Sequence, residues 1–155
     1  MKNTFKLIVS FLVCGGVGFL GSLFTTPAIS DWYDFLMQPD ITPPNWVFGV
    51  VWTILFFLMG VSLYLVWKET GKDKRRAIII FFIQLVLNLL WSILFFGLQN
   101  PLLALIEIVV LFIAILATIV SFLKINKTAA FLLLPYLAWV GFATVLNYFF
   151  YVLNF

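Results

Sequence analysis

The sequence contains no histidine and only one cysteine, Cys14. Without histidine, the chain cannot form a serine–histidine–aspartate triad, a histidine-containing zinc site or the usual histidine ligation of haem iron. A single cysteine cannot form a disulfide within one chain, so we expect Cys14 to be a small packing residue. We therefore predict neither a metal site nor a resident cofactor.

Charged residues are also scarce. They make up 10% of the 155 residues, whereas 65% are hydrophobic and the mean hydropathy is +1.18. Soluble domains carry about 25% charged residues, so this composition indicates an integral membrane protein. The sequence lacks the alternating apolar and polar strands that are typical of a membrane barrel.

Five apolar runs are long enough to cross a bilayer as helices, which takes about 20 residues. The first continues past the length of a signal-peptide core without an A-x-A-like cleavage site, so we expect it to be retained. We predict one domain (1–155), an all-α bundle of five transmembrane helices. The predicted spans are about 5–24, 46–67, 77–98, 102–123 and 129–153.

The segment 25–45 is the only long connection between these runs. It contains four prolines, which argue against a continuous helix: Pro27, Pro39, Pro43 and Pro44. Within the segment, Ser30 is suited to cap a short helix over 31–37. A long loop in a compact domain is usually functional, which favours a lid, but its aromatic residues fit an interfacial belt equally well.

Two of the runs carry polar and aromatic residues at helical spacing. The stripe in the third run is Gln84, Asn88, Trp91 and Phe95, and the stripe in the fifth is Tyr136, Trp139, Val140, Ala143 and Asn147. A side-chain amide in hydrocarbon needs a partner, so Asn88 and Asn147 should face protein or a cavity rather than lipid. Taken alone, these stripes fit either helix packing or the wall of a site for a bulky planar ligand.

The distribution of charge predicts the orientation. All nine lysines and arginines lie in residues 2–6, 68–76 and 124–127, segments that five spans place on one side of the membrane. The other side holds Asp31, Asp34 and Asp40 and no base. The positive-inside rule then places the N-terminus in the cytoplasm and the loop 25–45 and the C-terminus outside a cell membrane. We read the segment 68–76 as a solvated loop and predict no nucleic-acid partner.

The special residues of different helices share one depth. At about 1.5 Å per residue, Trp52, Trp91 and Asn147 each lie about 9 Å from the outer ends of their helices. Packing stripes on separate helices need not share a depth beneath one loop. The common depth therefore favours a pocket in the outer half of the bundle.

Several segments, in order along nearly the whole chain, resemble the translocator protein family (TspO/MBR), also called the tryptophan-rich sensory protein or peripheral benzodiazepine receptor family. With its basic loops and its lack of histidine, the chain looks like a bacterial member of this family. The matching segments are Trp32-Tyr33, Pro43-Pro44-Asn45-Trp46-Val47-Phe48 through Trp52-Thr53, Gln84 with Asn88 and Trp91-Ser92 through Phe96, and Pro135-Tyr136-Leu137-Ala138-Trp139 through Leu146-Asn147.

The resemblance implies a pocket, closed by the first loop, for tetrapyrroles such as protoporphyrin IX and for isoquinoline carboxamide or benzodiazepine-type drugs. It also implies a homodimer in the bilayer. Animal members carry a sterol pattern that ends in a base, and no base follows Tyr148 or Tyr151 here, which argues against sterol binding. The pocket positions are Tyr33, Pro43, Trp52, Phe56, Asn88, Trp91, Trp139, Ala143 and Leu146, to which the polar stripe adds Asn147.

Three functions remain open. The first is a receptor or carrier for tetrapyrroles or other drug-like hydrophobic ligands. The second is light- and oxygen-dependent degradation of protoporphyrin, as the resemblance implies for some members, with Trp52 and Trp139 as redox-active neighbours of the ring. The third is a sensory protein without turnover. Glu107 is the only acid or base well inside a span, and we expect it to turn toward the outer interface or to hydrogen-bond as a neutral acid.

Overall fold

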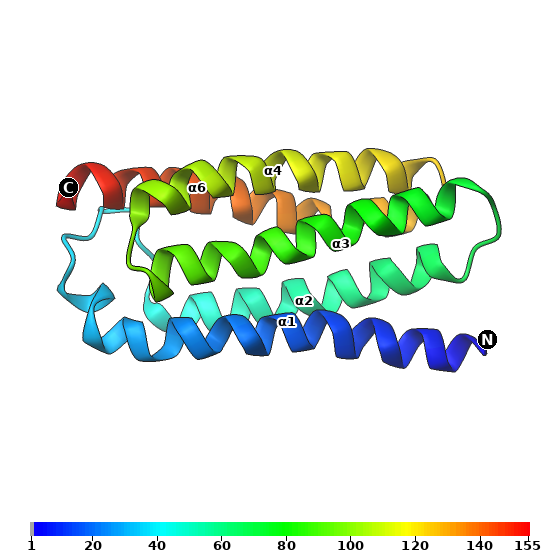
Figure 1. Cartoon of the computed structure of the whole chain (residues 1–155), viewed down its shortest axis with the longest axis horizontal. Helices are drawn as coiled ribbons and strands as arrows, with labels where there is room; N and C mark the ends of the chain where they lie inside the picture. The colour runs from blue at the N-terminus through cyan, green and yellow to red at the C-terminus, as the bar shows by residue number, and fades with distance from the viewer. Residues whose placement is uncertain (1) are drawn as a thin grey trace.

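The computed structural model describes residues 2–155, which form helices and connecting segments and no strand. Five of the helical segments are long and apolar enough to cross a membrane, which confirms the predicted multi-pass helical bundle (Figure 1). The elements are α1 (Asn3–Asp31), the 3-10 helix η1 (Tyr33–Phe35), α2 (Asn45–Trp67), α3 (Asp73–Ser92), the π-helical turn η2 (Ile93–Gly97), α4 (Pro101–Leu123), α5 (Lys127–Phe131) and α6 (Leu134–Asn154).

The helices lie side by side along one long axis, with the N-terminus at one end and the C-terminus at the other (Figure 1). α1 packs against α2 and α3, whereas α4 packs against α3 and α6. The α2–α3 and α4–α5 connections share the end that holds the N-terminus. There Lys6 Nζ and Lys74 Nζ each donate to the Trp67 carbonyl oxygen at 3.3 Å. The three basic segments thus lie at one end of the bundle, as predicted.

The first helix is longer than predicted, because it continues through Pro27 to Asp31 instead of ending near residue 24. A proline removes one backbone donor, which a packed membrane helix tolerates. This part of α1 packs against η2, where the Phe24 ring lies 3.0 Å from the position of a Cβ on Gly97. The predicted helix over 31–37 with a Ser30 cap is therefore wrong, since Ser30 lies inside α1. The loop shortens to residues 32–44 around η1.

The fifth span, predicted as one helix over 129–153, is broken. α5 ends at Phe131, and α6 begins at Leu134 with Pro135 in its first turn. Proline disfavours helical conformation in the residue before it and donates no hydrogen bond, so the chain makes a tight turn here. The two pieces still cross as one segment, Lys127–Asn154.

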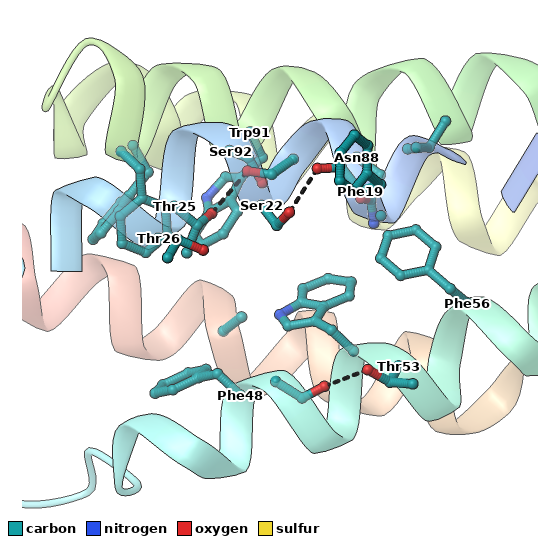
Figure 2. A pocket seen from close by; sticks show the side chains of 18 of the residues that line it. Phe19, Ser22, Thr25, Thr26, Phe48, Thr53, Phe56, Asn88, Trp91 and Ser92 are labelled. Carbon is teal, nitrogen blue, oxygen red and sulfur yellow. Dashed lines mark hydrogen bonds between the residues drawn. The ribbon is translucent and has the colours of Figure 1, made fainter. Parts of the chain in front are cut away.

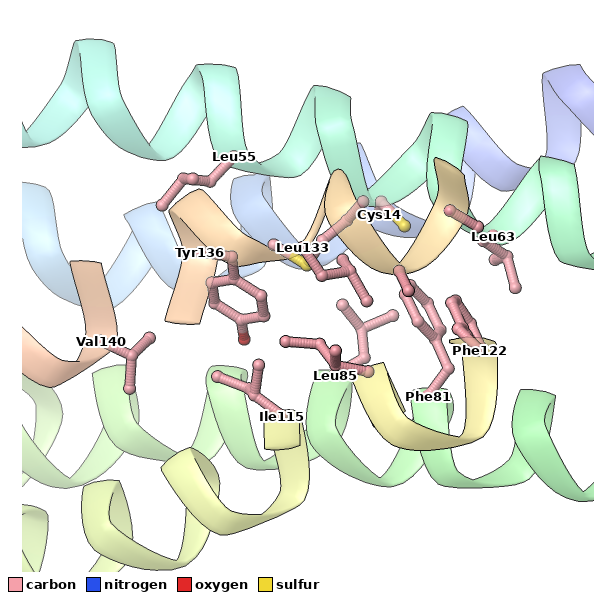
Figure 3. Close-up of a cluster of buried hydrophobic side chains, with 14 of the residues drawn as sticks. Cys14, Leu55, Leu63, Phe81, Leu85, Ile115, Phe122, Leu133, Tyr136 and Val140 are labelled. Carbon is pink, nitrogen blue, oxygen red and sulfur yellow. The ribbon is translucent and has the colours of Figure 1, made fainter. Parts of the chain in front are cut away.

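The half of the bundle nearest the basic loops is tightly packed (Figure 3). Phe81 and Phe122 stack there with ring centroids 5.8 Å apart, and both side chains are fully buried. Cys14 is buried and free, which confirms it as a packing residue. Gly60 brings α2 close to α1, since a Cβ on it would lie 2.7 Å from the Phe11 ring. Such close contacts hold membrane helices together.

Candidate functional site

The main cavity lies between α1, α2, α3 and α6, in the half of the bundle beneath the loop 32–44. Its volume is about 620 Å³, within the range of small-molecule sites. Figure 2 shows Ser22, Thr25 and Thr26 of α1 on one side of it and Phe48 and Thr53 of α2 on the other.

Nine of the ten predicted ligand-binding residues line this cavity, and their role in binding stays a prediction. Pro43 does not belong to the wall. It precedes Pro44, the residue that caps α2, and the wall on this helix begins at Asn45. The nine are Tyr33, Trp52, Phe56, Asn88, Trp91, Trp139, Ala143, Leu146 and Asn147.

Hydrogen bonds hold the buried amides in place. Asn88 Nδ2 donates to the Tyr136 hydroxyl at 2.8 Å, and this hydroxyl donates to Gln84 Oε1 at 2.8 Å. Trp91 Nε1 donates to Asn147 Oδ1 at 3.0 Å, and Asn147 Nδ2 donates to the Pro101 carbonyl oxygen at 2.9 Å. The amides therefore face protein and cavity, as expected, and the two stripes both join helices and build the wall.

Flat aromatic surfaces make up much of the wall. Trp91 stacks on Phe95 with ring centroids 5.2 Å apart, while Trp139 packs against Phe48 at 5.8 Å. Trp52 lies 5.7 Å from Phe56 on the same helix. The Trp139 indole nitrogen is buried and has no hydrogen-bond partner among the described residues. Such a wall offers stacking surface and, among the described residues, no charged side chain.

The contribution of α1 to the wall is not predicted from the sequence. Gly15, Gly18, Ser22, Thr25 and Ile29 recur every three or four residues and all line the cavity. That spacing of small residues is also the pattern of close helix packing, which is why it does not identify a wall. Gly18 serves both roles, since a Cβ there would lie 2.8 Å from the Phe56 ring.

The cavity is open on one side of the bundle. Phe19, Ser22 and Thr26 on α1 line the cavity and are also exposed. The same holds for Gly49 and Thr53 on α2. The opening therefore lies along the edge between these two helices.

The loop 32–44 closes the end of the cavity and is bonded to the end of α6. The Asn154 side chain accepts from the Met37 backbone nitrogen at 2.7 Å and donates to the Met37 carbonyl oxygen at 3.0 Å. Tyr33 packs inward on Phe150, with ring centroids 5.1 Å apart. Phe35 points outward and is 81% exposed. The loop thus places Tyr33 in the wall of the cavity and Phe35 on the outside, and its role as a lid stays a prediction.

Glu107 stands apart from this cavity. It lies on α4 with 7% of its surface exposed, and neither carboxyl oxygen has a hydrogen-bond partner in the described chain. The expectation that it turns toward the interface or forms a hydrogen bond is therefore wrong. Its helix packs between α3 and α6, so the side chain is enclosed by its neighbours.

Comparisons with known proteins find similar sequences over nearly the whole chain. Residues 10–153 match the TspO/MBR family. The chain is 49% identical over 152 residues to the tryptophan-rich protein TspO of Archaeoglobus fulgidus, covering 98% of this chain and 99% of that protein. It is 41% identical to the translocator protein of Homo sapiens, covering 84% and 79%. It is 34% identical to the tryptophan-rich sensory protein of Cereibacter sphaeroides, covering 96% and 91%.

Proposed function

The chain belongs to the TspO/MBR family, and on that premise we propose that it is a membrane receptor or carrier for large planar hydrophobic ligands. The ligand classes are tetrapyrroles, protoporphyrin IX above all, and isoquinoline carboxamide or benzodiazepine-type drugs. The protein is a multi-pass membrane protein, so these ligands reach it from a bilayer in which they dissolve.

The observation that carries the proposal is one cavity with three tryptophans in its wall. Trp52, Trp91 and Trp139 come from three helices and surround a space of about 620 Å³. An aromatic ring that stacks on a planar ligand contributes about 0.5–1.5 kcal/mol beyond the area it buries. Three indoles around one space therefore favour a flat, extended π-system over a flexible chain.

We also propose an orientation of the bundle in the membrane and a homodimeric assembly. The three basic segments lie at one end of the bundle, and the positive-inside rule puts that end in the cytoplasm. The cavity and the loop 32–44 then lie in the outer half of a cell membrane. The homodimer rests on the family resemblance alone.

Light-driven degradation of protoporphyrin is a second candidate, and the joint presence of Trp52 and Trp139 in one wall favours it. In this reaction light excites the bound ring and an indole donates one electron to it. The reduced ring passes an electron to molecular oxygen, and the indole radical recovers its electron from the ring, so that the ring is oxidised and oxygen is reduced. The chain would then act as an enzyme without acid–base residues, which agrees with a wall that has no acidic or basic side chain.

Binding is tested by titrating the purified protein in detergent with protoporphyrin IX and following the absorbance of the porphyrin. Ala143→Phe fills the cavity, because Ala143 lies in its wall. Ala138→Phe is the matched control, since Ala138 lies on the same helix but is exposed and outside the wall. We expect saturable binding by the parent and by Ala138→Phe and loss of binding in Ala143→Phe. Equal binding by all three proteins would mean that the ligand does not occupy this cavity.

A further inference from the structure

Two of the nine lysines and arginines differ from the others. Lys6 on α1 and Lys74 in the first turn of α3 are half-buried, whereas the remaining bases are exposed. Both ammonium groups lie 3.3 Å from one acceptor, the Trp67 carbonyl oxygen at the end of α2. The ends of three helices thus hold two positive charges close together at the basic end of the bundle.

No acidic side chain is bonded to this pair among the described residues. The two ammonium groups donate to backbone carbonyl oxygens, that of Trp67 and, for Lys74, also that of Glu69 at 2.8 Å. The Glu69 carboxylate instead accepts from the Asn126 side chain at 3.0 Å. Two like charges that share one carbonyl oxygen repel each other, and an anion between them offsets this repulsion. The pair is therefore suited to a negatively charged group from outside the chain.

The pair also has hydrogen-bond donors left for such a group. A lysine ammonium has three N–H donors, and charged acceptors such as phosphate oxygens form the strongest bonds with them. Within the described chain, Lys6 uses one of its donors and Lys74 uses two, so both ammonium groups retain free donors. Because these donors lie close together, they can reach the oxygens of a single phosphate group.

The position of the pair favours a lipid as the source of this phosphate. Trp67 ends a membrane-spanning helix, and tryptophan is enriched at the boundary between hydrocarbon and water. Phe5 and Ile8, on the same helix as Lys6 and close to it in sequence, are exposed and thus open to lipid chains. A phospholipid brings its phosphate to this depth while its chains lie along the bundle.

We propose that Lys6 and Lys74 form a binding site for the phosphate of an anionic phospholipid, in the leaflet at the basic end of the bundle. Clusters of lysine and arginine beside membrane helices attract anionic lipids in general. Here two bases hold the headgroup directly, and the exposed bases add only a screened attraction. A zwitterionic lipid binds more weakly, because its own cation balances the phosphate. The site is independent of the ligand of the cavity, which lies in the other half of the bundle.

The first experiment measures lipid binding to the purified protein in a non-ionic detergent by native mass spectrometry. Phosphatidylglycerol is compared with phosphatidylcholine of the same acyl chains. The double variant Lys6→Gln/Lys74→Gln removes the pair. The matched control is Lys124→Gln/Lys127→Gln, which removes the same charge from exposed lysines at the same end of the bundle.

We expect the parent and the control to bind phosphatidylglycerol at least about tenfold more tightly than phosphatidylcholine, which corresponds to about 1.4 kcal/mol. We expect Lys6→Gln/Lys74→Gln to bind the two lipids about equally. Equal binding of both lipids by the parent would overturn the inference. An equal loss of phosphatidylglycerol binding in the two double variants would also overturn it, because the effect would then follow overall charge.

Inorganic phosphate, added at constant ionic strength, distinguishes a lipid from a dissolved anion. We expect it not to displace phosphatidylglycerol from the parent at the concentration at which the lipid itself binds, because it gains no contact between lipid chains and helix. Displacement at that concentration would assign the pair to a soluble anion and overturn the inference.

A single replacement tests the same site with less disturbance of the fold. Lys74→Gln leaves Lys6 as a donor to the Trp67 carbonyl oxygen. Its matched control is Lys72→Gln, one turn outside the pair, where the side chain is exposed. We expect Lys74→Gln to weaken phosphatidylglycerol binding by about threefold and Lys72→Gln to leave it nearly unchanged. Binding by Lys74→Gln as tight as that by Lys72→Gln would contradict the inference.

Discussion

At the scale of single residues, some side chains of the cavity wall also form the hydrogen bonds that join the helices. Trp91 is oriented by its bond to Asn147 at 3.0 Å, so its ring is fixed before any ligand arrives. The indole nitrogens of Trp52 and Trp139 donate no hydrogen bond within the described chain, and aromatic neighbours hold both rings in place. The two unbonded indoles are therefore the ones whose replacement changes least in the fold.

Replacing Trp52 or Trp139 with phenylalanine distinguishes binding from degradation. Phenylalanine keeps most of the apolar surface, so we expect protoporphyrin affinity to fall by about 1 kcal/mol. Phenylalanine is far harder to oxidise than an indole, so any light-driven loss of porphyrin absorbance above the protein-free rate should nearly disappear. Binding titrations in the dark and absorbance under aerobic illumination measure the two effects. Bleaching equal to that of the parent in both variants would remove the enzymatic function. If both variants lost binding, the bleaching test would not decide, and binding would be measured with a smaller ligand.

Glu107 is a buried polar group that the fold does not satisfy. Leaving such a group without a hydrogen bond costs about 1–3 kcal/mol. Methionine has a similar length and no polar group that needs a partner, so we expect Glu107→Met to raise the midpoint of thermal unfolding in detergent. Ligand affinity should stay unchanged, because Glu107 does not line the cavity.

The matched control for Glu107 is Thr118→Val on the same helix. The Thr118 hydroxyl is buried but already donates to the Ala114 carbonyl oxygen at 2.8 Å, so removing it brings no comparable gain. A lower unfolding midpoint for Glu107→Met than for the parent would show that the carboxyl group has a stabilising partner. Loss of ligand binding in a folded Glu107→Met would show that it acts on the site.

At the scale of elements, the loop 32–44 and the end of α6 form one unit. The carboxamide of Asn154 pairs with both backbone groups of Met37, which joins positions 117 residues apart. A side chain that pairs with a backbone in this way fixes the loop without a strand. The bonds are exposed, so they are weak enough to break when the loop moves.

Asn154→Ala tests whether this pairing controls access to the cavity. Each lost hydrogen bond lowers the stability of the closed loop conformation by about 1 kcal/mol. We expect the dissociation rate of a bound neutral ligand to rise by about tenfold, because two such bonds are lost and their effects overlap. Stopped-flow displacement measures the rate, and Val152→Ala, an exposed change on the same helix, is the control. An unchanged dissociation rate would mean that ligands leave by another route, such as the opening between α1 and α2.

At the scale of the whole molecule, charge divides the bundle into two ends. The basic end is tightly packed, and the acidic end holds the cavity and its loop. The orientation of the bundle in the membrane therefore decides from which side of the membrane the loop 32–44 is reached.

Single cysteines test the orientation. Placed at Asp73 and at Asp40, in protein whose buried Cys14 does not react, they lie at opposite ends of the bundle. We expect a membrane-impermeant thiol reagent added to intact cells to label position 40 only, and position 73 to be labelled only after the membrane is opened. The reverse pattern would place the cavity in the cytoplasmic half.

The sequence by itself determined the class of fold, the number of spans and the clustering of charge at one end, because hydrocarbon imposes strict rules on length, polarity and backbone bonding. It also determined the neighbourhood of the cavity, because Trp52, Trp91 and Asn147 sit at equal distances from their helix ends. Each of these features depends on residues within a single helix, so the spacing of residues in the sequence predicts it.

Only the tertiary structure decided how the helices share their surfaces. It showed that α1 continues through Pro27, that the small residues of α1 form wall as well as contact, and that Pro43 lies outside the wall. It also showed Asn154 bonded to the loop and Glu107 without a partner. Each of these depends on which atoms of distant segments meet, and no local spacing specifies that.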